Sequence, residues 1–276
     1  TGIGLIKDLP IIIMAKLMSK DVYLHLHNKG ISNFKKHVVF NIIYKYVFHK
    51  TKVIILSDRL YYEIEDYVSK DNVIVIPNTS NKSPIKRPSL SVINDTIKFI
   101  YVGNFIKSKG LLDAIDSVRI LKERNINKKF QLNIVGQDSD LKTLEIQKII
   151  NENDLNQEVN IIGPLYGSDL NKLYQESDIM IFPSYYHFEC LPLVLIEALQ
   201  FGIALISTNN GAISDIVVDN YNGNIVEFNS PDQITNCLET LCLKSNLLSE
   251  FKLNSSNLFN DKFHYNNFKN SINHIF

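Results

Sequence analysis

The chain has 276 residues and 45% of them are hydrophobic, so it can bury one large core or two modest ones. This is not the composition of a disordered protein. Lysine plus arginine and aspartate plus glutamate each number 29, so no global electric field favours nucleic acid or a strongly anionic surface. An anionic ligand must therefore be bound by local groups.

The cysteines and the apolar runs indicate in which cellular compartment the protein works and whether it crosses a membrane. Cys190, Cys237 and Cys242 show neither zinc-site spacing nor a disulfide framework, which is typical of a reducing cytosol. Lysine interrupts runs such as LPIIIMAKLM well before the roughly 18 to 20 residues that cross a bilayer, and no signal peptide is visible. We expect a cytoplasmic protein that is soluble or peripheral on the inner face of the membrane. Because Thr1 starts the chain in what resembles mid-domain, we also expect a missing N-terminal segment.

Short apolar segments rich in β-branched residues alternate with segments of helical period along the whole chain. Buried parallel strands with crossover helices have this pattern, because such strands are covered on both faces and lose the apolar/polar alternation. We predict a doubly wound α/β fold, and helix in the last thirty residues. The predicted strands are DVYLHLH, KVIILS, NVIVIP, KFIYVG, FQLNIVG, VNIIG, DIMIFPS and IALIST.

The first predicted strand carries two histidines. His25 and His27 alternate along DVYLHLH and should point to one face. His27 lies at the carboxyl end of the strand, the edge at which open α/β sheets bind ligands. It could hydrogen-bond a hydroxyl group or help to transfer a proton. The alternative is a packed structural histidine, and this alternative is favoured for His25.

The next segment, FKKHVVFNIIYKYVFHK, combines basic residues with an aromatic and aliphatic stripe. A helix that lies on anionic lipid has this pattern, and so does an ordinary helix whose stripe faces the core. Both interpretations stay open. The basic residues are Lys35, Lys36, His37, Lys45, His49 and Lys50.

A polar segment then divides the chain. NTSNKSPIKRPSLSVINDT, at residues 78–96, is dense in serine, asparagine, proline and lysine, as an exposed linker is. We predict an incomplete N-terminal Rossmann-like domain over residues 1–80, a linker over 81–96, a nucleotide-binding domain over 97–260 and a C-terminal helix over 261–276.

The most informative segment is SYYHFECLPLVLIEALQFG, which follows the strand DIMIFP. Its helix, from about Pro192, carries apolar residues on nearly every face and should be buried, yet Glu197 lies in its middle. A carboxylate there needs a hydrogen-bonding partner, such as a sugar or ribose diol. A structural salt bridge or a solvent-exposed helix end is the alternative.

The loop before this helix could bind a diphosphate. Proline suits a first helical turn, and the peptide groups around Cys190, Leu191, Pro192 and Leu193 would line the helix N-terminus, where N–H donors are free. Glu189 stands beside them and could bind sugar hydroxyls or stabilise positive charge at an anomeric carbon. It could also be a common first-turn acid that complements the helix dipole.

Glu189 and Glu197, with seven residues between them, resemble the Glu-x7-Glu motif of retaining glycosyltransferase family 4, which has the GT-B fold. The resemblance covers nearly all of residues 97–227, and several motifs in the right order are more specific than one acidic pair. It implies two Rossmann-like domains that face a cleft. The other matching segments are YVGNFIKSKGLLDAIDSV, IVGQDSD, VNIIGPLYGSDLNKLYQESDIMIFPS and GAISDIVVDNYNGNIVE.

The resemblance implies a role for each acid and for the start of the helix. Glu197 would bind the ribose hydroxyls of a UDP- or GDP-sugar, and Glu189 would contact the transferred sugar. The backbone at Leu193 and Val194 would contact the phosphates. Lys109 matches the lysine that neutralises the diphosphate, and a fixed ammonium can stabilise that leaving group without a metal. Such a surface lysine is otherwise simply solvated.

Two residues depart from the family pattern. Asn104 follows Gly103 where the family commonly has arginine, so one cationic contact is absent unless Lys107 replaces it. Cys190 stands where glycine is usual, and we expect a backbone role for it because no neighbouring histidine–acid pair would activate the thiol.

Features of the two domains also bear on the acceptor and on metals. His27 resembles the family's acceptor-domain histidine, and the basic segment would dock near a lipid-linked acceptor. Asp138 and Asp140 form a D-x-D triplet, the metal signature of a different transferase architecture, but we expect a solvated loop or a helix cap here and no metal. No other cofactor is expected.

The resemblance implies transfer of a sugar, with retention of the anomeric configuration, from a nucleotide diphosphate sugar to a glycan or polyprenyl-diphosphate-linked acceptor. By family analogy, the pathway would be bacterial O-antigen or capsule synthesis. A nucleotide-sugar epimerase of the same fold and a non-catalytic nucleotide-sugar-binding fragment are the alternatives. An NAD dehydrogenase is disfavoured because no strand is followed by G-x-G-x-x-G.

Overall fold

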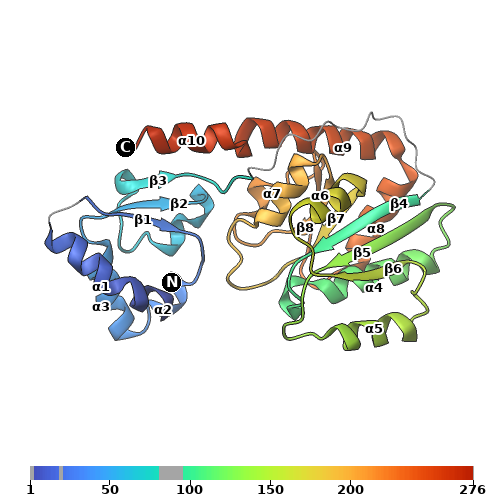
Figure 1. Ribbon diagram of the computed structural model, residues 1–276, viewed down its shortest axis with the longest axis horizontal. Helices are drawn as coiled ribbons and strands as arrows, with labels where there is room; N and C mark the ends of the chain where they lie inside the picture. The colour runs from blue at the N-terminus through green and yellow to red at the C-terminus, as the bar shows by residue number, and fades with distance from the viewer. Residues whose placement is uncertain (1–2, 19–20, 81–95, 276) are drawn as a thin grey trace.

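The computed structural model describes residues 3–18, 21–80 and 96–275, and they form two α/β units (Figure 1). All strands of both sheets pair in parallel, which confirms the predicted fold class. The first sheet has the order β1-β2-β3 and the second β6-β5-β4-β7-β8-β9. The strands are β1 Tyr23–Leu26, β2 Lys52–Ile55, β3 Val73–Val75, β4 Thr96–Val102, β5 Lys129–Val135, β6 Val159–Gly163, β7 Ile179–Phe182, β8 Ala204–Thr208 and β9 Gly223–Val226.

The six-stranded sheet is covered on both faces, as its apolar strands require. Along β4, Phe99 and Tyr101 belong to one core cluster, whereas Ile100 and Val102 belong to the other. The first cluster includes side chains of α4 (Leu111–Glu123), α5 (Thr143–Glu152), α8 (Pro231–Leu243) and α9 (Ser245–Leu258). The second includes side chains of α6 (Gly167–Glu176) and α7 (Leu193–Gln200).

The three-stranded sheet has a smaller core beneath α1 (Ile3–Leu17), α2 (Ile31–Phe34) and α3 (Val38–Phe48). The apolar side chains of the basic segment, residues 34–50, include a buried group and an exposed group. Tyr44, Val47 and Phe48 are buried, whereas other apolar side chains of α3 are exposed to solvent. No helix in the described parts of the chain is long and apolar enough to cross a bilayer.

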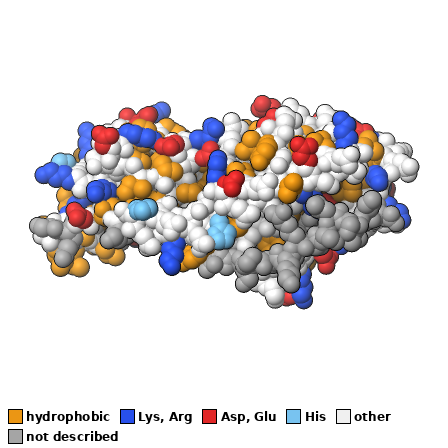
Figure 2. Space-filling view, turned by 90° about the horizontal axis from the view of Figure 1, so that it is seen from above, with side chains coloured by type: hydrophobic (Ala, Val, Ile, Leu, Met, Phe, Trp, Pro, Cys, Tyr) orange, Lys and Arg blue, Asp and Glu red, His pale blue; other side chains and the backbone are white. Residues whose placement is uncertain are grey.

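The two units are joined by loops and by the end of the chain. Figure 1 shows α9 and then α10 (Tyr265–Asn273) running across the top of both sheets, joined by the π-helical segment Phe259–Phe263. Thr79 donates a hydrogen bond to the Phe263 carbonyl (2.7 Å), and Arg59 forms an ion pair with Asp215 (2.7 Å). On the face in Figure 2, acidic and basic side chains are interspersed.

The eight predicted strands and the predicted C-terminal helices are present. β9 was not predicted, because GNIV is short and half of it is glycine and asparagine. Residues 81–95 of the predicted linker lie outside the described residues, and Thr96 is the first residue of β4.

Gly110 packs the N-terminus of α4 against the end of β7. Its φ is 78°, and a Cβ atom there would lie 2.4 Å from the Pro183 carbonyl oxygen. Gly163 has a similar φ of 86° but open space around it.

We expect Gly163→Ala to cost about 1 to 2 kcal/mol of unfolding free energy through its backbone alone, and Gly110→Ala about 1 to 3 kcal/mol more. Urea unfolding measures both, and equal losses would contradict the packing role of Gly110.

Candidate active site

The site lies where the order of the six-stranded sheet changes direction. β4 pairs with β5 on one side and with β7 on the other, so the connections after β4 and β7 leave the same sheet edge at a topological switch point. Ligands of open α/β sheets bind in this crevice. Lys109 follows β4 and Glu189 follows β7, and the structure therefore brings the two residues together.

Glu189 is 9% exposed and accepts a hydrogen bond from the Ser184 hydroxyl at 3.1 Å. Burial raises the pKa of this carboxyl group, while Lys109, the Ser184 hydrogen bond and Lys29 all act to lower it. The carboxylate is therefore costly on its own and depends on the two ammonium groups that stabilise its charged form.

Lys109 ends the short 3-10 helix Lys107–Lys109 that leads into α4. Its Nζ lies 5.7 Å from the centre of the Tyr186 ring and 6.0 Å from that of Phe182. A Cβ atom on Gly103 would lie 3.7 Å from Cδ of Lys109, so Gly103 lines the same corner. The aromatic rings restrict the ammonium to the sheet edge.

The start of α7 lies beside Glu189. Pro192 is the N-cap rather than a residue of the first helical turn, and α7 begins at Leu193, whose side chain is 50% exposed. The loop before it is held firmly: the Cys190 carbonyl accepts a hydrogen bond from Ala212 N (2.8 Å) and the Leu191 carbonyl one from Asn78 Nδ2 (2.8 Å).

The Cys190 thiol is only 7% exposed, and burial raises its pKa to about 12. A thiol with such a pKa is protonated at neutral pH and is a poor nucleophile. The carbonyl of Cys190, by contrast, accepts the hydrogen bond from Ala212 N and helps to hold the loop.

Glu197 lies on the next turn of α7 and is half-buried. The Tyr174 hydroxyl on α6 donates a hydrogen bond to its Oε2 atom at 3.1 Å. The sequence indicated that a carboxylate here needs a donor, and a protein hydroxyl supplies one. In the loop after β4, Asn104 is exposed, and its carbonyl accepts a hydrogen bond from Ile106 N at 2.7 Å.

The D-x-D triplet has the structural role expected of a loop and helix cap. Asp138 accepts hydrogen bonds from the backbone N–H (2.9 Å) and hydroxyl (2.6 Å) of Thr143, the first residue of α5. Asp140 accepts one from Lys107 N at 2.8 Å and so ties the loop after β4 to the loop after β5. Within the described residues, no cluster of three or more histidine, cysteine, aspartate or glutamate side chains could hold a metal ion.

His25 and His27 point to the same face, as the strand period predicts, with ring centres 4.1 Å apart. His27 is exposed directly after β1, at the carboxyl edge of the three-stranded sheet. His25 is packed, in line with its favoured structural interpretation, and its Nε2 atom is buried with no hydrogen-bond partner among the described residues.

Sequence reasoning missed three polar residues of the site: Lys29, Ser184 and Asn210. All three are buried, and Lys29 donates a hydrogen bond to Asn210 Oδ1 at 2.9 Å across 181 positions of sequence. One sequence signal was available. Lys29 precedes Gly30 directly after a predicted strand, just as Lys109 precedes Gly110.

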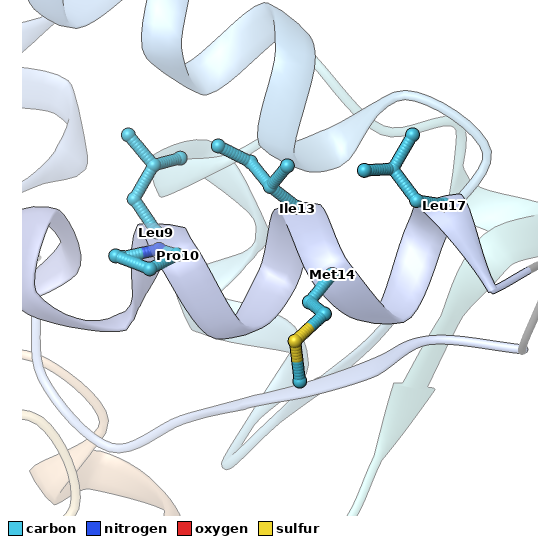
Figure 3. A pocket seen from close by; sticks show the side chains of 5 residues that line it. All are labelled: Leu9, Pro10, Ile13, Met14 and Leu17. Atoms are coloured by element: carbon cyan, nitrogen blue, oxygen red, sulfur yellow. The ribbon is translucent and has the colours of Figure 1, made fainter.

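The described residues form a groove and a small cavity whose lining side chains differ in polarity. A groove of about 610 Å³ runs along α1, and all of its lining side chains are apolar (Figure 3), so it offers no group for a diphosphate. A cavity of about 10 Å³, the size of one water molecule, lies between the two units. The groove is lined by Leu9, Pro10, Ile13, Met14 and Leu17, and the cavity by Leu26, Asn28, Lys29, Ile55, Leu60, Glu63 and Cys190.

Comparison with known structures identifies the architecture as GT-B. The Anabaena protein HepE in complex with UDP superposes with a TM-score of 0.81 at 15% identity, over 97% of this chain and 75% of that one. The chain belongs to the family of glycosyl transferases group 1, whose model matches residues 82–257.

Curated relatives point the same way. The chain is 26% identical over 254 residues to the capsular polysaccharide biosynthesis glycosyltransferase CapM of Staphylococcus aureus, covering 86% of this chain and 64% of that protein. It is 24% identical over 183 residues to the UDP-Gal:alpha-D-GlcNAc-diphosphoundecaprenol alpha-1,3-galactosyltransferase of Escherichia coli, covering 63% and 46%. The chain thus spans about half to two thirds of the length of these relatives.

The packed His25 makes stability depend on pH. Burial and, to a lesser extent, the charge of His27 lower the pKa of His25 from 6.5 to about 4. A hydrogen bond to the Ile76 backbone acts in the opposite direction and raises the pKa. Below about pH 6.5 the unfolded chain binds a proton at this position before the folded chain does, so stability falls as pH falls towards 4. We expect His25→Asn to lose less unfolding free energy than the parent between pH 7 and pH 5.

Urea unfolding at the two pH values measures this difference, with His49→Asn as the control because His49 is an exposed histidine of the same domain. If His25→Asn and the parent lose stability in parallel, the assigned role of His25 is wrong.

Proposed function

We propose that this protein is a retaining glycosyltransferase of family 4, which moves a sugar from a UDP- or GDP-sugar to a glycan or polyprenyl-diphosphate-linked saccharide. The observation that carries the proposal is the meeting of Lys109 and Glu189 at the switch point between β4 and β7. The name of the Staphylococcus aureus relative supports a role in capsular polysaccharide synthesis, and that of the Escherichia coli relative supports a polyprenyl-diphosphate-linked acceptor.

The donor would span the start of α7. Free N–H groups of the first helical turn, at Leu193 and Val194, would bind the diphosphate together with Lys109. Glu197 would bind the ribose hydroxyls while Tyr174 fixes one of its oxygens, and Glu189 would bind hydroxyls of the transferred sugar. Gly103 and Asn104, in the loop after β4, and the backbone of residues 190–192, in the loop before α7, would line the diphosphate.

Transfer would proceed by front-face displacement. The bond between the anomeric carbon and the diphosphate oxygen breaks, and the acceptor oxygen bonds to the same face of that carbon. The acceptor's proton passes to the departing diphosphate. Lys109 and the helix N–H groups stabilise the charge that the diphosphate gains, which is the work a metal does in other transferases. His27 would orient the acceptor or the transferred sugar from the other domain.

The two alternatives predict different products. An epimerase changes the nucleotide sugar without an acceptor, and a binding fragment retains the donor without transfer. Product analysis with and without a panel of acceptors separates the three. Glu189 favours transfer, because a buried carboxylate beside two ammonium groups resembles a site for a developing cationic carbon more than a simple binding surface.

We expect Lys109→Ala to lower the rate of transfer roughly 30- to 150-fold, which is about 2 to 3 kcal/mol of lost transition-state stabilisation. The donor is first chosen by a thermal-shift screen of nucleotide sugars, since a ligand at a hundred times its Kd stabilises by about 2.7 kcal/mol. Lys148→Ala is the matched control, because Lys148 is an exposed lysine on α5 that pairs only loosely with Glu152 (3.6 Å). Turnover of Lys109→Ala within a factor of two of the parent would refute the role.

We also propose that the N-terminal domain rests on an anionic membrane. α1 packs against α3, and both expose large apolar side chains beside exposed lysines such as Lys36 and Lys45. Apolar contact and attraction to acidic headgroups add in such a surface. The exposed apolar residues are Ile11, Met14, Leu17 and Met18 of α1 and its end, and Val38, Val39, Ile42 and Tyr46 of α3.

We expect Val39→Glu to weaken binding to phosphatidylglycerol-containing vesicles roughly tenfold in a sedimentation assay, because it places a negative charge within the apolar surface. Leu144→Glu is the control, since Leu144 is 84% exposed on α5 of the other domain. Equal binding of the two variants, or equal binding of the parent to neutral vesicles, would contradict membrane docking.

A further inference from the structure

A lysine is buried between the two domains. Lys29 follows β1 in the N-terminal domain and is only 9% exposed, although lysine is almost never fully buried unless it is paired. Its Nζ atom donates a hydrogen bond to Asn210 Oδ1, which follows β8 in the other domain, at 2.9 Å. This contact crosses the domain boundary and joins the carboxyl edges of the two sheets.

Asn210 is oriented to receive this lysine. Its Nδ2 group donates hydrogen bonds to the Tyr186 carbonyl at 2.8 Å and the Ser184 carbonyl at 3.3 Å, and its Oδ1 atom is thereby turned towards Lys29. Ser184 also donates its hydroxyl hydrogen to Glu189. The asparagine therefore ties the ammonium to the loop that carries Glu189.

The lysine is fixed equally well on its own side. The carboxylate of Glu63, itself 7% exposed, accepts hydrogen bonds from Gly30 N at 2.9 Å and from the backbone N–H (3.1 Å) and hydroxyl (3.0 Å) of Ser32. These bonds hold the chain directly after Lys29. The ammonium is thus presented on a rigid loop, and its position relative to Glu189 depends on how the domains are docked.

We propose that Lys29 is a positioning residue. Its hydrogen bond to Asn210 holds the two domains together over Glu189, and its ammonium group is the second one beside that carboxylate. The proposal rests on the proposed function for the use of Glu189, but the domain contact can be tested without it. The charged groups that act on Glu189 are Lys109 from the loop after β4 and Lys29 from the loop after β1. Tyr101 from β4 and Cys190 from the same loop as Glu189 also face the site, and the charge of Glu189 raises the pKa of each.

The consequence is a site that is complete only in the docked arrangement. If the domains separate, Glu189 loses one of the two cations that offset its burial. Docking would therefore couple substrate enclosure to the ionisation of the carboxylate that contacts the sugar, in the way that closure completes other active sites.

Cys190 reports on this docking without any enzymatic activity. Its thiol is buried next to Lys29 in the small cavity between the domains, whereas Cys242 is buried in the core of the larger domain. A pulse of iodoacetamide followed by mass spectrometry measures the alkylation of both in the unmodified full chain. We expect Lys29→Met to speed alkylation of Cys190 about tenfold or more, as expected for the loss of a charge-assisted hydrogen bond, and to leave Cys242 unchanged.

The direction of this effect is diagnostic. Lys29 lowers the pKa of the Cys190 thiol, so removing its charge would by itself slow alkylation, and faster alkylation reports greater exposure of the thiol. Lys52→Met is the matched control, because Lys52 contacts Tyr23 within its own domain (3.2 Å). Asn210→Ala should act like Lys29→Met, and the double variant should add little. Unchanged or slower alkylation of Cys190 in Lys29→Met would overturn the proposal.

The second measurement is the pH dependence of kcat/KM for release of UDP or GDP from UDP-glucose, UDP-galactose, UDP-N-acetylglucosamine or GDP-mannose. The acidic limb of Lys29→Met should move upward by about 0.5 to 1 pH unit, and Lys29→Arg should keep it near that of the parent. An unmoved limb would overturn the electrostatic part of the proposal. A parent that releases neither nucleotide in the presence of the acceptor panel refutes the proposed function, and the alkylation result still decides the domain contact.

Discussion

The burial of the Glu189 carboxylate is the constraint around which this structure is organised. An ionised carboxylate with so little contact with water is unfavourable unless opposite charge and hydrogen-bond donors surround it. Ser184 supplies a donor from the preceding strand end, Lys109 a charge from the loop after β4, and Lys29 a charge from the other domain. Each group comes from a different segment, so the site can exist only in the folded, docked molecule.

Parallel strands make this convergence possible. Because β4 and β7 are neighbours that run the same way, the chain leaves both at one edge, and two loops far apart in sequence meet there. Close packing at Gly110 draws the start of α4 against Pro183 and thereby fixes Lys109 over the Phe182 and Tyr186 rings. The Gly110–Pro183 backbone contact and the position of the Lys109 charge both follow from the parallel pairing of β4 and β7.

Sequence patterns could predict the elements and part of the site. Apolar runs identified eight strands, because a strand buried on both faces has a composition that local sequence shows directly. Residues within one loop and helix, such as Glu189 and Glu197, were linked because their spacing is local. β9 was missed because its short segment contains little apolar sequence, and the Tyr174 donor to Glu197 was missed because it comes from another helix.

The pairs Lys29–Gly30 and Lys109–Gly110 show which part of the site the sequence could not predict. Both lysines lie in loops that follow strands, and each is followed by a glycine with positive φ, 120° at Gly30 and 78° at Gly110. Lys109 could be singled out through the family resemblance of its own segment, which lies within one domain. The partner of Lys29 lies 181 positions away, and no periodicity or spacing encodes how two domains dock. A buried lysine after a strand is better taken as a sign that another part of the chain, or a ligand, must come to meet it, because the desolvated ammonium would otherwise favour the open arrangement.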